Sequence, residues 1–248
     1  MSKFVSQNLI KYITTNPAIN SLQNSEQIYL SLKQDNFKII KQAYILTDKD
    51  IHNNNIDIKL SGTTCNLIII LNSHLICANV GDSRSILIYN EDNDPELINC
   101  KIFPLSKDQK LEIPEEKNRI IISGGIVEQV KDSRGIASGP LRVFKPGKNY
   151  PGLAMSRSIG DSIAKNLGVI AEPDVMEYNL DFKTKFVVMG SDGIWEFLSN
   201  EDVKKIGKPF YLNYDSRELC EELYNSALIQ WKINDEVVDD ITAIVIYF

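Results

Sequence analysis

Apolar side chains at helical spacing open the chain, at Phe4, Val5, Leu9, Tyr12 and Ile13. This spacing predicts an amphipathic helix over residues 3–14, because side chains three and four positions apart share one face. Asn24 followed by Gln27 resembles a capping box, and apolar residues continue intermittently to Leu46. We therefore expect a second and longer helix from Asn24 onward.

The pattern changes at Thr63, where runs of apolar and β-branched residues begin. Three such runs, TTCNLIIIL (63–71), HLICANV (74–80) and SILIY (85–89), are separated by short polar turns. Three sequential strands joined by tight turns suggest an antiparallel meander. The nearly continuous apolar character of these runs implies strands buried on both faces, or a sheet packed on another sheet.

The second half of the chain alternates helical and strand-like segments. Pro114 is expected to open a helix that ends at a Gly-Gly pair, and a strand and a polar, glycine-bearing loop follow. Helices are also expected near residues 200–206 and 216–231, and a strand ends the chain. No repeat or shift in composition interrupts residues 1–248, so we expect one α+β domain with strands in two layers and helices outside.

Charge and composition argue against several classes of protein. The 248 residues are 43% hydrophobic and 24% charged, and the net charge of −6 disfavours a nucleic-acid groove or a basic membrane-surface helix. No apolar stretch approaches the ~20 residues that span a bilayer, and the N-terminus has no signal-peptide layout. The four cysteines form no Cys-x-x-Cys pair and suggest buried free thiols in a reducing compartment. We expect a monomer in the cytoplasm or nucleus, with no nucleic-acid or membrane partner.

Acidic side chains stand where predicted strands meet loops. Asp192 and Asp82 each follow an apolar run, and Asp239 and Asp240 immediately precede the last strand. If such carboxylates converged, either some would be protonated or a cation would lie among them, because like charges at close range cannot all stay ionised. Mg²⁺ and Mn²⁺ prefer oxygen ligands, whereas two distant histidines and unpaired cysteines give no zinc site. The alternative is that each Asp only forms a turn, since Asp-Gly and Gly-Asp are common turn signals.

Seven sequence segments help to distinguish a metal site from simple Asp turns. They run from Ser61 to the C-terminus and read SGTTCNLIII, ANVGDSRSIL, RIIISGGIVEQ, PGLAMSRSIGD, VIAEPDV, FVVMGSDGIWEFLSNEDV and DDITAIVI. Together they resemble the motifs of the metal-dependent serine/threonine protein phosphatases, the PPM or type 2C family. The resemblance implies two antiparallel sheets packed face to face as a sandwich, with helices on the outer faces.

The resemblance also implies a binuclear Mg²⁺ or Mn²⁺ centre. By motif, Asp192 and Asp239 match metal ligands of that centre, and Asp82 matches a ligand of a further, weaker ion. Glu196 stands where many members of the family have an aspartate that serves the same weaker ion. The implied activity is hydrolysis of phosphoserine and phosphothreonine by a metal-activated water, with a phosphoprotein as substrate.

Two early family signatures, an Arg and the segment Asp-Gly-His-Gly, do not occur in this sequence. In the family they supply a bridging carboxylate, a carbonyl ligand, a phosphate-binding guanidinium and a general acid. VSQNLIKYI resembles the helix that follows Asp-Gly-His-Gly, so we expect the sequence to start just beyond it, without the family's first strands. Three alternatives stay open: a phosphatase whose sequence is truncated or mispredicted here, a pseudophosphatase that binds a phosphoprotein or regulatory partner without turnover, and a structural α/β domain with Asp turns.

Several residues near these motifs are expected to be structural. Arg84 and Arg157 are expected to pair with nearby carboxylates or carbonyls, because a guanidinium holds planar acceptors at two points. Asp161, in the same loop as Arg157, is expected to brace that loop, and Trp195 is expected to pack in the core. Gln109 stands where the family usually has the histidine of Asp-His-Lys, which removes a ring that could form hydrogen bonds, and the sequence does not predict the consequence.

Overall fold

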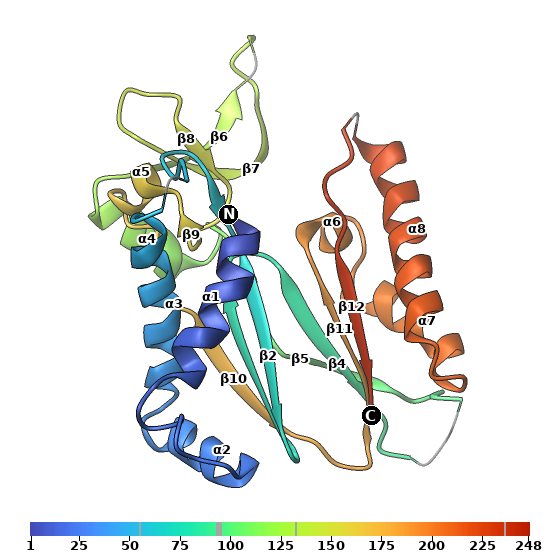
Figure 1. The fold of residues 1–248 in the computed structure, drawn as a ribbon. Coiled ribbons are helices and arrows are strands. Elements are labelled where there is room, and N and C mark those ends of the chain that lie inside the picture. The colour runs from blue at the N-terminus through green and yellow to red at the C-terminus, as the bar shows by residue number, and fades with distance from the viewer. Residues whose placement is uncertain (55, 93–95, 132, 236) are drawn as a thin grey trace. The chain divides into compact units, whose positions relative to one another are not determined.

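The chain forms two compact units in the computed structural model, which describes residues 1–54, 56–92, 96–131, 133–235 and 237–248 (Figure 1). Each unit is assembled from three segments that are separate in the sequence. Unit 1 comprises Met1–Cys65, Ala78–Asp82 and Asp108–Val175, and unit 2 comprises Asn66–Cys77, Ser83–Lys107 and Met176–Phe248. The expected single domain over residues 1–248 stays a prediction.

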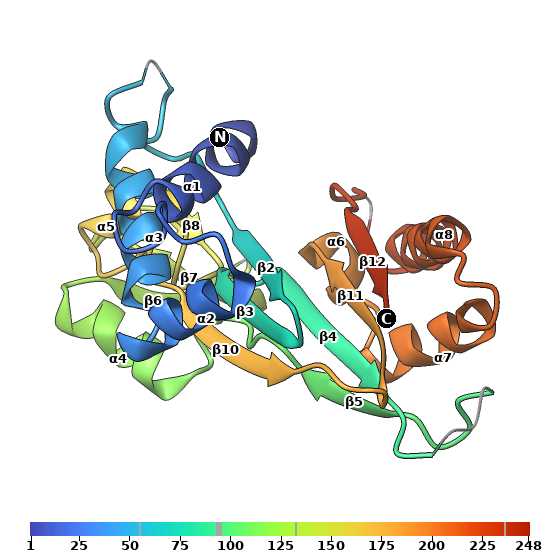
Figure 2. The same cartoon turned by 60° about the horizontal axis from the view of Figure 1, so that its bottom comes forward.

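Three helices open unit 1: α1 (Ser2–Thr14), α2 (Ser25–Gln34) and α3 (Lys38–Ile51). The first of them confirms the helix predicted over residues 3–14, and it buries Val5, Leu9 and Ile13. Figure 2 shows α1 beside α3, and the two helices are in contact. The apolar stripe read from the sequence is therefore the packing surface of α1.

The longer second helix expected from Asn24 is wrong, because the chain breaks between α2 and α3. Asn24 does cap α2, since its side chain accepts a hydrogen bond from the Glu26 backbone N–H. Asn36 and Phe37 then adopt φ values of 55° and 58°. This is a left-handed conformation that a right-handed helix does not accommodate. The apolar residues up to Leu46 consequently belong to two helices.

Short strands and two helices complete unit 1. Its remaining elements are β1 (Gly62–Thr63), α4 (Pro114–Ile122), β6 (Ile126–Lys131), β7 (Ala137–Phe144), β8 (Pro151–Leu153), β9 (Ile159–Gly160) and α5 (Ser162–Lys165). An antiparallel sheet contains β6, β7 and β8 in that order, and β1 pairs with β9. Helix α4 begins at Pro114 as predicted. Strand β7 falls in the predicted loop, because its first half is exposed and carries no apolar alternation.

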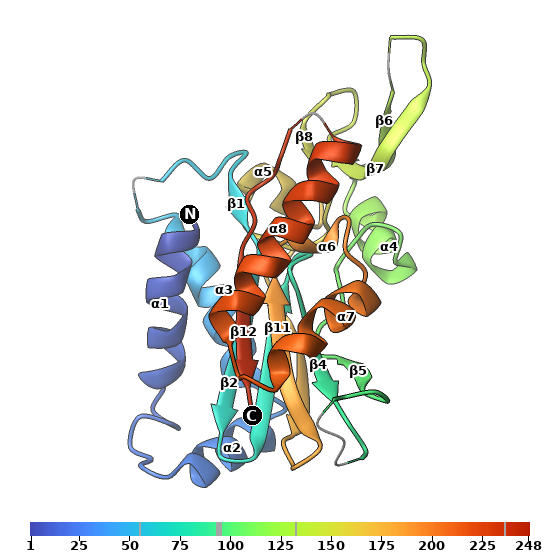
Figure 3. The ribbon, with the colours of Figure 1, turned by 90° about the vertical axis from the view of Figure 1, so that its right-hand side faces the viewer.

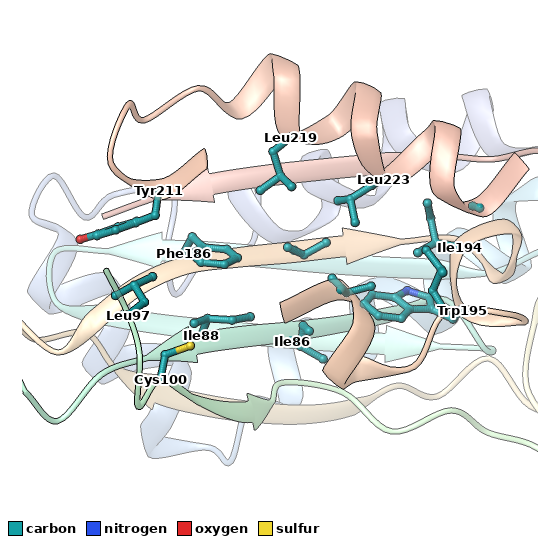
Figure 4. Close-up of a cluster of buried hydrophobic side chains, with 14 residues drawn as sticks. Ile86, Ile88, Leu97, Cys100, Phe186, Ile194, Trp195, Tyr211, Leu219 and Leu223 are labelled. Carbon is teal, nitrogen blue, oxygen red and sulfur yellow. The ribbon is translucent and has the colours of Figure 1, made fainter. Parts of the chain in front are cut away.

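Unit 2 is organised around a four-stranded antiparallel sheet in the described part of the chain. Its strands are β4 (Arg84–Tyr89), β5 (Lys101–Pro104), β11 (Thr184–Gly190) and β12 (Ala243–Tyr247), in the order β12-β11-β4-β5. One face is covered by α6 (Asp192–Trp195), α7 (Asn200–Tyr211) and α8 (Ser216–Asn234), of which Figure 3 shows α7 and α8 clearly. Ile86, Ile88 and Phe186 of the sheet pack there with Leu219 and Leu223 of α8 (Figure 4).

A second sheet has strands divided between the two units, and the portions that belong to unit 2 pack on the opposite face of the four-stranded sheet. It contains β2 (Cys65–Leu71), β3 (His74–Val80) and β10 (Asp174–Asn179) in the order β10-β3-β2. Within unit 2, Leu75 and Cys77 of β3 are buried in one cluster with Leu87 of β4 and Val187 of β11. Successive side chains of β4 therefore alternate between the helices and the second sheet. This arrangement confirms the predicted α+β fold with antiparallel sheets flanked by helices.

The predicted three-strand meander is wrong. Strands β2 and β3 share one sheet, but β4 belongs to the other, so the chain changes sheets after β3. Gly81 in this connection has a φ of 99°, a conformation that favours glycine. The continuous apolar runs thus arise from one sheet packing on another, the second explanation left open by the sequence.

All four cysteines are free thiols, as predicted. Cys77 and Cys100 are buried, and Cys65 and Cys220 are half-buried. Burial raises the pKa of the Cys77 thiol to about 12 and that of Cys65 to about 11. Among the described residues, no helix combines the length and the apolar character that crossing a membrane requires.

Candidate functional site

The end of β11 is tied to the start of β12. Gly190 at the end of β11 pairs with Ala243 at the start of β12. Beyond this pair, the Ser191 N–H donates to the Thr242 carbonyl oxygen at 3.1 Å, and the Ser191 hydroxyl donates to the Asp240 carbonyl oxygen at 3.0 Å. The Thr242 N–H donates back to the Ser191 hydroxyl at 3.1 Å. Ser191 thus holds the segment before β12 beside the segment after β11.

This register brings Asp192 and Asp239 to the same end of two neighbouring strands. Asp192 begins α6 directly after Ser191 and is half-buried. Asp239 is exposed, and its Oδ1 accepts a hydrogen bond from the Asp240 N–H at 2.7 Å. Antiparallel neighbours contribute opposite chain ends to one edge of a sheet, so two residues distant in the sequence lie on adjacent segments there.

Glu196 follows the same short helix. Its backbone N–H donates to the Asp192 carbonyl oxygen at 2.8 Å, and the residue is exposed. Positions four apart on a helix lie on the same face. Glu196 therefore follows Asp192 on one face of α6.

Gly193 allows the two segments to approach. A Cβ atom at this position would lie 2.4 Å from the Asp240 carbonyl oxygen, far inside van der Waals contact. Any side chain there would push the segments apart. The indole N–H of Trp231 on α8 donates to the Gly193 carbonyl oxygen at 2.7 Å and anchors the turn to the helix layer. Glycine at position 193 is therefore a packing requirement of this edge.

Trp195 and Arg84 are structural, as predicted. Trp195 is 6% exposed, packs in the core, and donates its indole N–H to the carbonyl oxygens of Gly190 at 2.9 Å and Arg84 at 3.0 Å. The Arg84 guanidinium lies over the indole ring, 5.1 Å from its centroid, and donates to the Asn200 side-chain oxygen at 2.8 Å. One indole thus links the ends of β11 and β4 to α6.

Asp82 lies in unit 1, in the turn after β3, and is 3% exposed. Its Oδ2 lies 3.4 Å from the Lys110 Nζ, and its Oδ1 has no hydrogen-bond partner among the described residues. Burial raises the pKa of the Asp82 carboxyl, and the Lys110 ammonium opposes this effect without cancelling it. A buried acceptor of this kind lacks the partner that such atoms normally have, which here would be a cation or a proton.

Gln109 holds the turn that leads to Asp82. This side chain is 1% exposed, and its Oε1 accepts a hydrogen bond from the Gly81 N–H at 2.7 Å. Its Nε2 donates to the Asn79 carbonyl oxygen at 3.0 Å and to the Asp174 carboxylate at 3.2 Å. An amide offers a donor and an acceptor, as a neutral imidazole does. Gln109 therefore supplies both kinds of bond to this turn.

Arg157 has the bracing role expected from the sequence. Its guanidinium donates to the carboxylates of Glu116 and Asp174, the latter at 3.0 Å. Glu116 is 5% exposed and also accepts hydrogen bonds from Arg119 and Ser156. Burial opposes ionisation of Glu116, but the bonds from the two arginines and the serine outweigh it and lower the pKa to about 2. These contacts fasten the loop of the SRSIGD motif to α4.

Asp161 is structural as well. Its backbone N–H donates to the Ser61 carbonyl oxygen at 2.9 Å, beside the pairing of β1 with β9. Its carboxylate fills the space next to Gly62, where an added Cβ would lie 1.7 Å from Oδ2. The Ser-Gly-Thr-Thr segment thus contains the short strand β1, in which Gly62 is required for close packing.

The predicted ligands fit a hard cation in chemistry and are incomplete in number. Asp192 and Asp239 are oxygen donors of the kind that Mg²⁺ and Mn²⁺ prefer. No group of three or more His, Cys, Asp or Glu side chains that could hold a metal ion occurs in the described ranges. Asp192 and Asp239 stay predicted ligands of a binuclear centre, and Asp82 and Glu196 stay predicted ligands of a weaker ion.

Two contributors were missed from the sequence. Ser191 cross-links the strand ends, and its position between the end of an apolar run and an Asp-Gly pair was an available signal, because serine readily bonds nearby backbone. Lys110 follows Gln109 at the position of the lysine of the family's Asp-His-Lys, but nothing in the sequence pairs it with Asp82. Its partner Asp82 is distant in the sequence, and only folding brings the two together.

The comparisons with known proteins agree with this geometry. A family profile described as Protein phosphatase 2C matches residues 3–234. The chain belongs to the protein phosphatase 2C family. Membership eliminates the third alternative, in which the family match was a misreading.

Curated members of the protein phosphatase 2C family resemble the chain over most of its length. Probable protein phosphatase 2C 12 from Oryza sativa subsp. japonica is 36% identical over 195 residues, which are 78% of this chain and 47% of that protein. Probable protein phosphatase 2C 73 from Arabidopsis thaliana is 33% identical over 205 residues, 81% of this chain and 52% of that protein. The chain thus spans about half the length of these curated relatives.

Solved structures match the fold. The serine-threonine phosphatase 2C from Toxoplasma gondii superposes with a TM-score of 0.80 at 19% identity, covering 99% of this chain and 81% of that one. A C. elegans sex determining protein gives a TM-score of 0.68 at 17% identity, covering 98% and 52%. At such identities the likeness concerns the arrangement of elements, and it agrees with the protein phosphatase 2C assignment.

Proposed function

We propose that this protein phosphatase 2C chain is the core of a metal-dependent phosphatase acting on phosphoserine and phosphothreonine in proteins. One observation carries the proposal beyond family membership: the β11–β12 register, with Ser191 bonded to Asp240 and Thr242, sets Asp192 and Asp239 on adjacent segments. Turn formation alone gives no reason for two aspartates to lie at one strand edge, whereas two carboxylates there supply the oxygen ligands that Mg²⁺ or Mn²⁺ prefers.

Asp192 and Asp239 are the proposed oxygen ligands for Mg²⁺ or Mn²⁺. Such ions, when bound, lower the pKa of a coordinated water and neutralise charge on phosphoryl oxygens. The chain itself contributes rigidity at this edge. Ser191 fixes the spacing of the two backbone segments, and Trp195 fixes the strand end beneath them. Rigid elements position ligands better than mobile loops do, which favours a preorganised site.

A pseudophosphatase is the second candidate. The observation that favours it is the lack of a cluster of three or more ligating side chains in the ranges described. Two carboxylates bind a divalent ion more weakly than a fuller set, because fewer charged oxygens replace its waters. In this case the chain would bind a phosphoprotein or a regulatory partner without turnover.

The remaining features of the proposal follow from the family and from the composition. A phosphoprotein is the proposed substrate, and the proposed state is a monomer in the cytoplasm or nucleus, with no nucleic-acid or membrane partner. The net charge of −6 supports the absence of a nucleic-acid partner, because a nucleic-acid groove needs clustered Lys and Arg.

Hydrolysis of a phosphothreonine peptide with Mn²⁺ tests the proposal. Two proteins are compared: this chain, and a chimaera in which the segment of a protein phosphatase 2C relative that ends in Asp-Gly-His-Gly precedes Met1. We expect turnover in the chimaera. Turnover in neither protein, with phosphopeptide binding retained in both, would reject the phosphatase and establish the pseudophosphatase.

Substitutions in the chimaera separate ligation from turn formation. Asp192→Asn and Asp239→Asn should each weaken Mn²⁺ binding by roughly 10- to 100-fold or more, measured by isothermal titration. Asp235→Asn is the matched control, because Asp235 is an exposed aspartate in the same approach to β12 and accepts a hydrogen bond from the Val237 N–H. Equal Mn²⁺ affinity in all three variants would show that the aspartates are not ligands.

A further inference from the structure

The buried carboxylate of Asp82 has a cation beside it that is part of the chain. Asp82 is 3% exposed, and its Oδ2 lies 3.4 Å from the Lys110 ammonium. The Lys110 side chain is 29% exposed, so it reaches solvent while the carboxylate does not. A buried negative charge is costly unless a positive charge compensates it. Lys110 supplies that compensation.

Lys110 contacts one of the two carboxylate oxygens of Asp82, namely Oδ2. Oδ1 of Asp82 is buried and has no hydrogen-bond partner among the described residues. An ionised carboxylate accepts about four hydrogen bonds, or it binds a cation through one or both oxygens. One lysine at 3.4 Å therefore leaves acceptor capacity at Asp82 that a harder cation would use.

The position of Lys110 is fixed by its neighbour Gln109. The Gln109 backbone N–H donates to the Gly81 carbonyl oxygen at 3.1 Å, and the side-chain amide bonds the Gly81 N–H and the Asn79 carbonyl oxygen. These three bonds join the segment before Lys110 to the turn before Asp82. The lysine is thus held at the carboxylate by backbone geometry, and its flexible side chain can still swing outward.

We infer that Lys110 is a built-in counter-ion that occupies the Asp82 carboxylate in the ion-free protein and yields it to a divalent cation. A divalent ion bound at the Asp82 carboxylate would lie close to the Lys110 ammonium, which is 3.4 Å from Oδ2, and the two positive charges would repel each other. Binding of Mg²⁺ or Mn²⁺ at Asp82 therefore requires the ammonium to move into solvent, and Lys110 weakens that binding. The inference deepens the proposed function and rests on it only for the identity of the ion.

The first measurement is the affinity for Mn²⁺ in the chain with and without the lysine charge. Lys110→Met is made in a background of Asp192→Asn and Asp239→Asn, so that the other predicted ligands do not contribute. We expect the affinity for Mn²⁺ to rise by at least about tenfold when the Lys110 charge is absent. Adding Asp82→Asn should abolish the gain. Equal affinity with and without Lys110, or a gain that survives Asp82→Asn, would overturn the inference.

Thermal unfolding provides an independent readout. Without divalent ions, Lys110→Met should lower the melting temperature, because it leaves a buried carboxylate unpaired. Mn²⁺ should then raise the melting temperature of Lys110→Met by about 4 °C more than that of the parent protein. If Lys110→Met does not fold in chelator, it should fold when Mn²⁺ is added, and failure to do so would also refute the inference.

Lys183→Met is the matched control. Lys183 pairs with Glu91 at 2.6 Å, but both side chains are substantially exposed, at 36% and 46%. Water solvates Glu91 when the lysine is removed, so no gain in Mn²⁺ affinity is expected. A gain equal to that of Lys110→Met would show a general charge effect and refute a site at Asp82. The phosphopeptide assay is separate, so the phosphatase proposal can fail while the Asp82 result stands.

Discussion

Replacing Glu116 with glutamine removes the negative charge at the centre of the contacts that fasten the SRSIGD loop to α4. The Glu116 carboxylate is 5% exposed and accepts hydrogen bonds from Arg119 at 2.6 Å, from Arg157 and from Ser156. Glutamine keeps the shape but has one acceptor oxygen and no charge. The two arginines then lose a shared anion, and we expect the folded protein to be destabilised.

The size of the effect follows from the pKa of Glu116. Hydrogen bonds from the arginines and the serine outweigh burial and lower this pKa from 4.5 to about 2 on folding. A carboxylate whose pKa falls on folding stabilises the folded state above the unfolded pKa, and this contribution is lost as the pH falls through the folded pKa. The shift corresponds to about 3 kcal/mol at pH 7, of which about 1.4 kcal/mol is gone at pH 3.5.

Urea unfolding followed by far-ultraviolet circular dichroism measures this contribution. The difference in unfolding free energy between the parent protein and Glu116→Gln should be about 3 kcal/mol at pH 7 and about 2 kcal/mol at pH 3.5. Glu115→Gln is the control, since Glu115 is an exposed neighbour on α4, and it should change stability by less than about 0.5 kcal/mol. A Glu116→Gln difference that stays constant between the two pH values would refute the argument.

Three other predictions concern unit 2 and the thiols. Gly193→Ala should destabilise the protein by about 1–3 kcal/mol in urea unfolding, because its Cβ would meet the Asp240 carbonyl oxygen at 2.4 Å; an unchanged midpoint would contradict this packing. Trp195→Phe should cost about 1–3 kcal/mol by removing the indole N–H that bonds two strand-end carbonyl oxygens, and a neutral result would mean that water replaces the indole. Cys77, with a pKa of about 12, should resist iodoacetamide at pH 8 until urea unfolds the chain, and rapid native labelling would disprove its burial.

Local pattern was enough to predict the elements whose signal lies within a few residues. The apolar stripe of α1, Pro114 at the start of α4 and the Asn24 cap are read from neighbouring positions, and each is present in the structure. The prediction from apolar spacing was wrong where the backbone leaves the helical conformation. Asn36 and Phe37 enter the left-handed region between α2 and α3, and no helical spacing signals such a break.

The sequence by itself determined the membership of the protein phosphatase 2C family, the α+β class and the acidic residues at strand ends. Only the tertiary structure decided that β3 and β4 lie in different sheets, that Ser191 joins the ends of β11 and β12, and that Lys110 meets Asp82. The physical reason is that an apolar run indicates that a strand is buried, but it does not identify the segments that pack against that strand. Long-range partners are chosen by packing and hydrogen bonding between segments that are far apart along the chain.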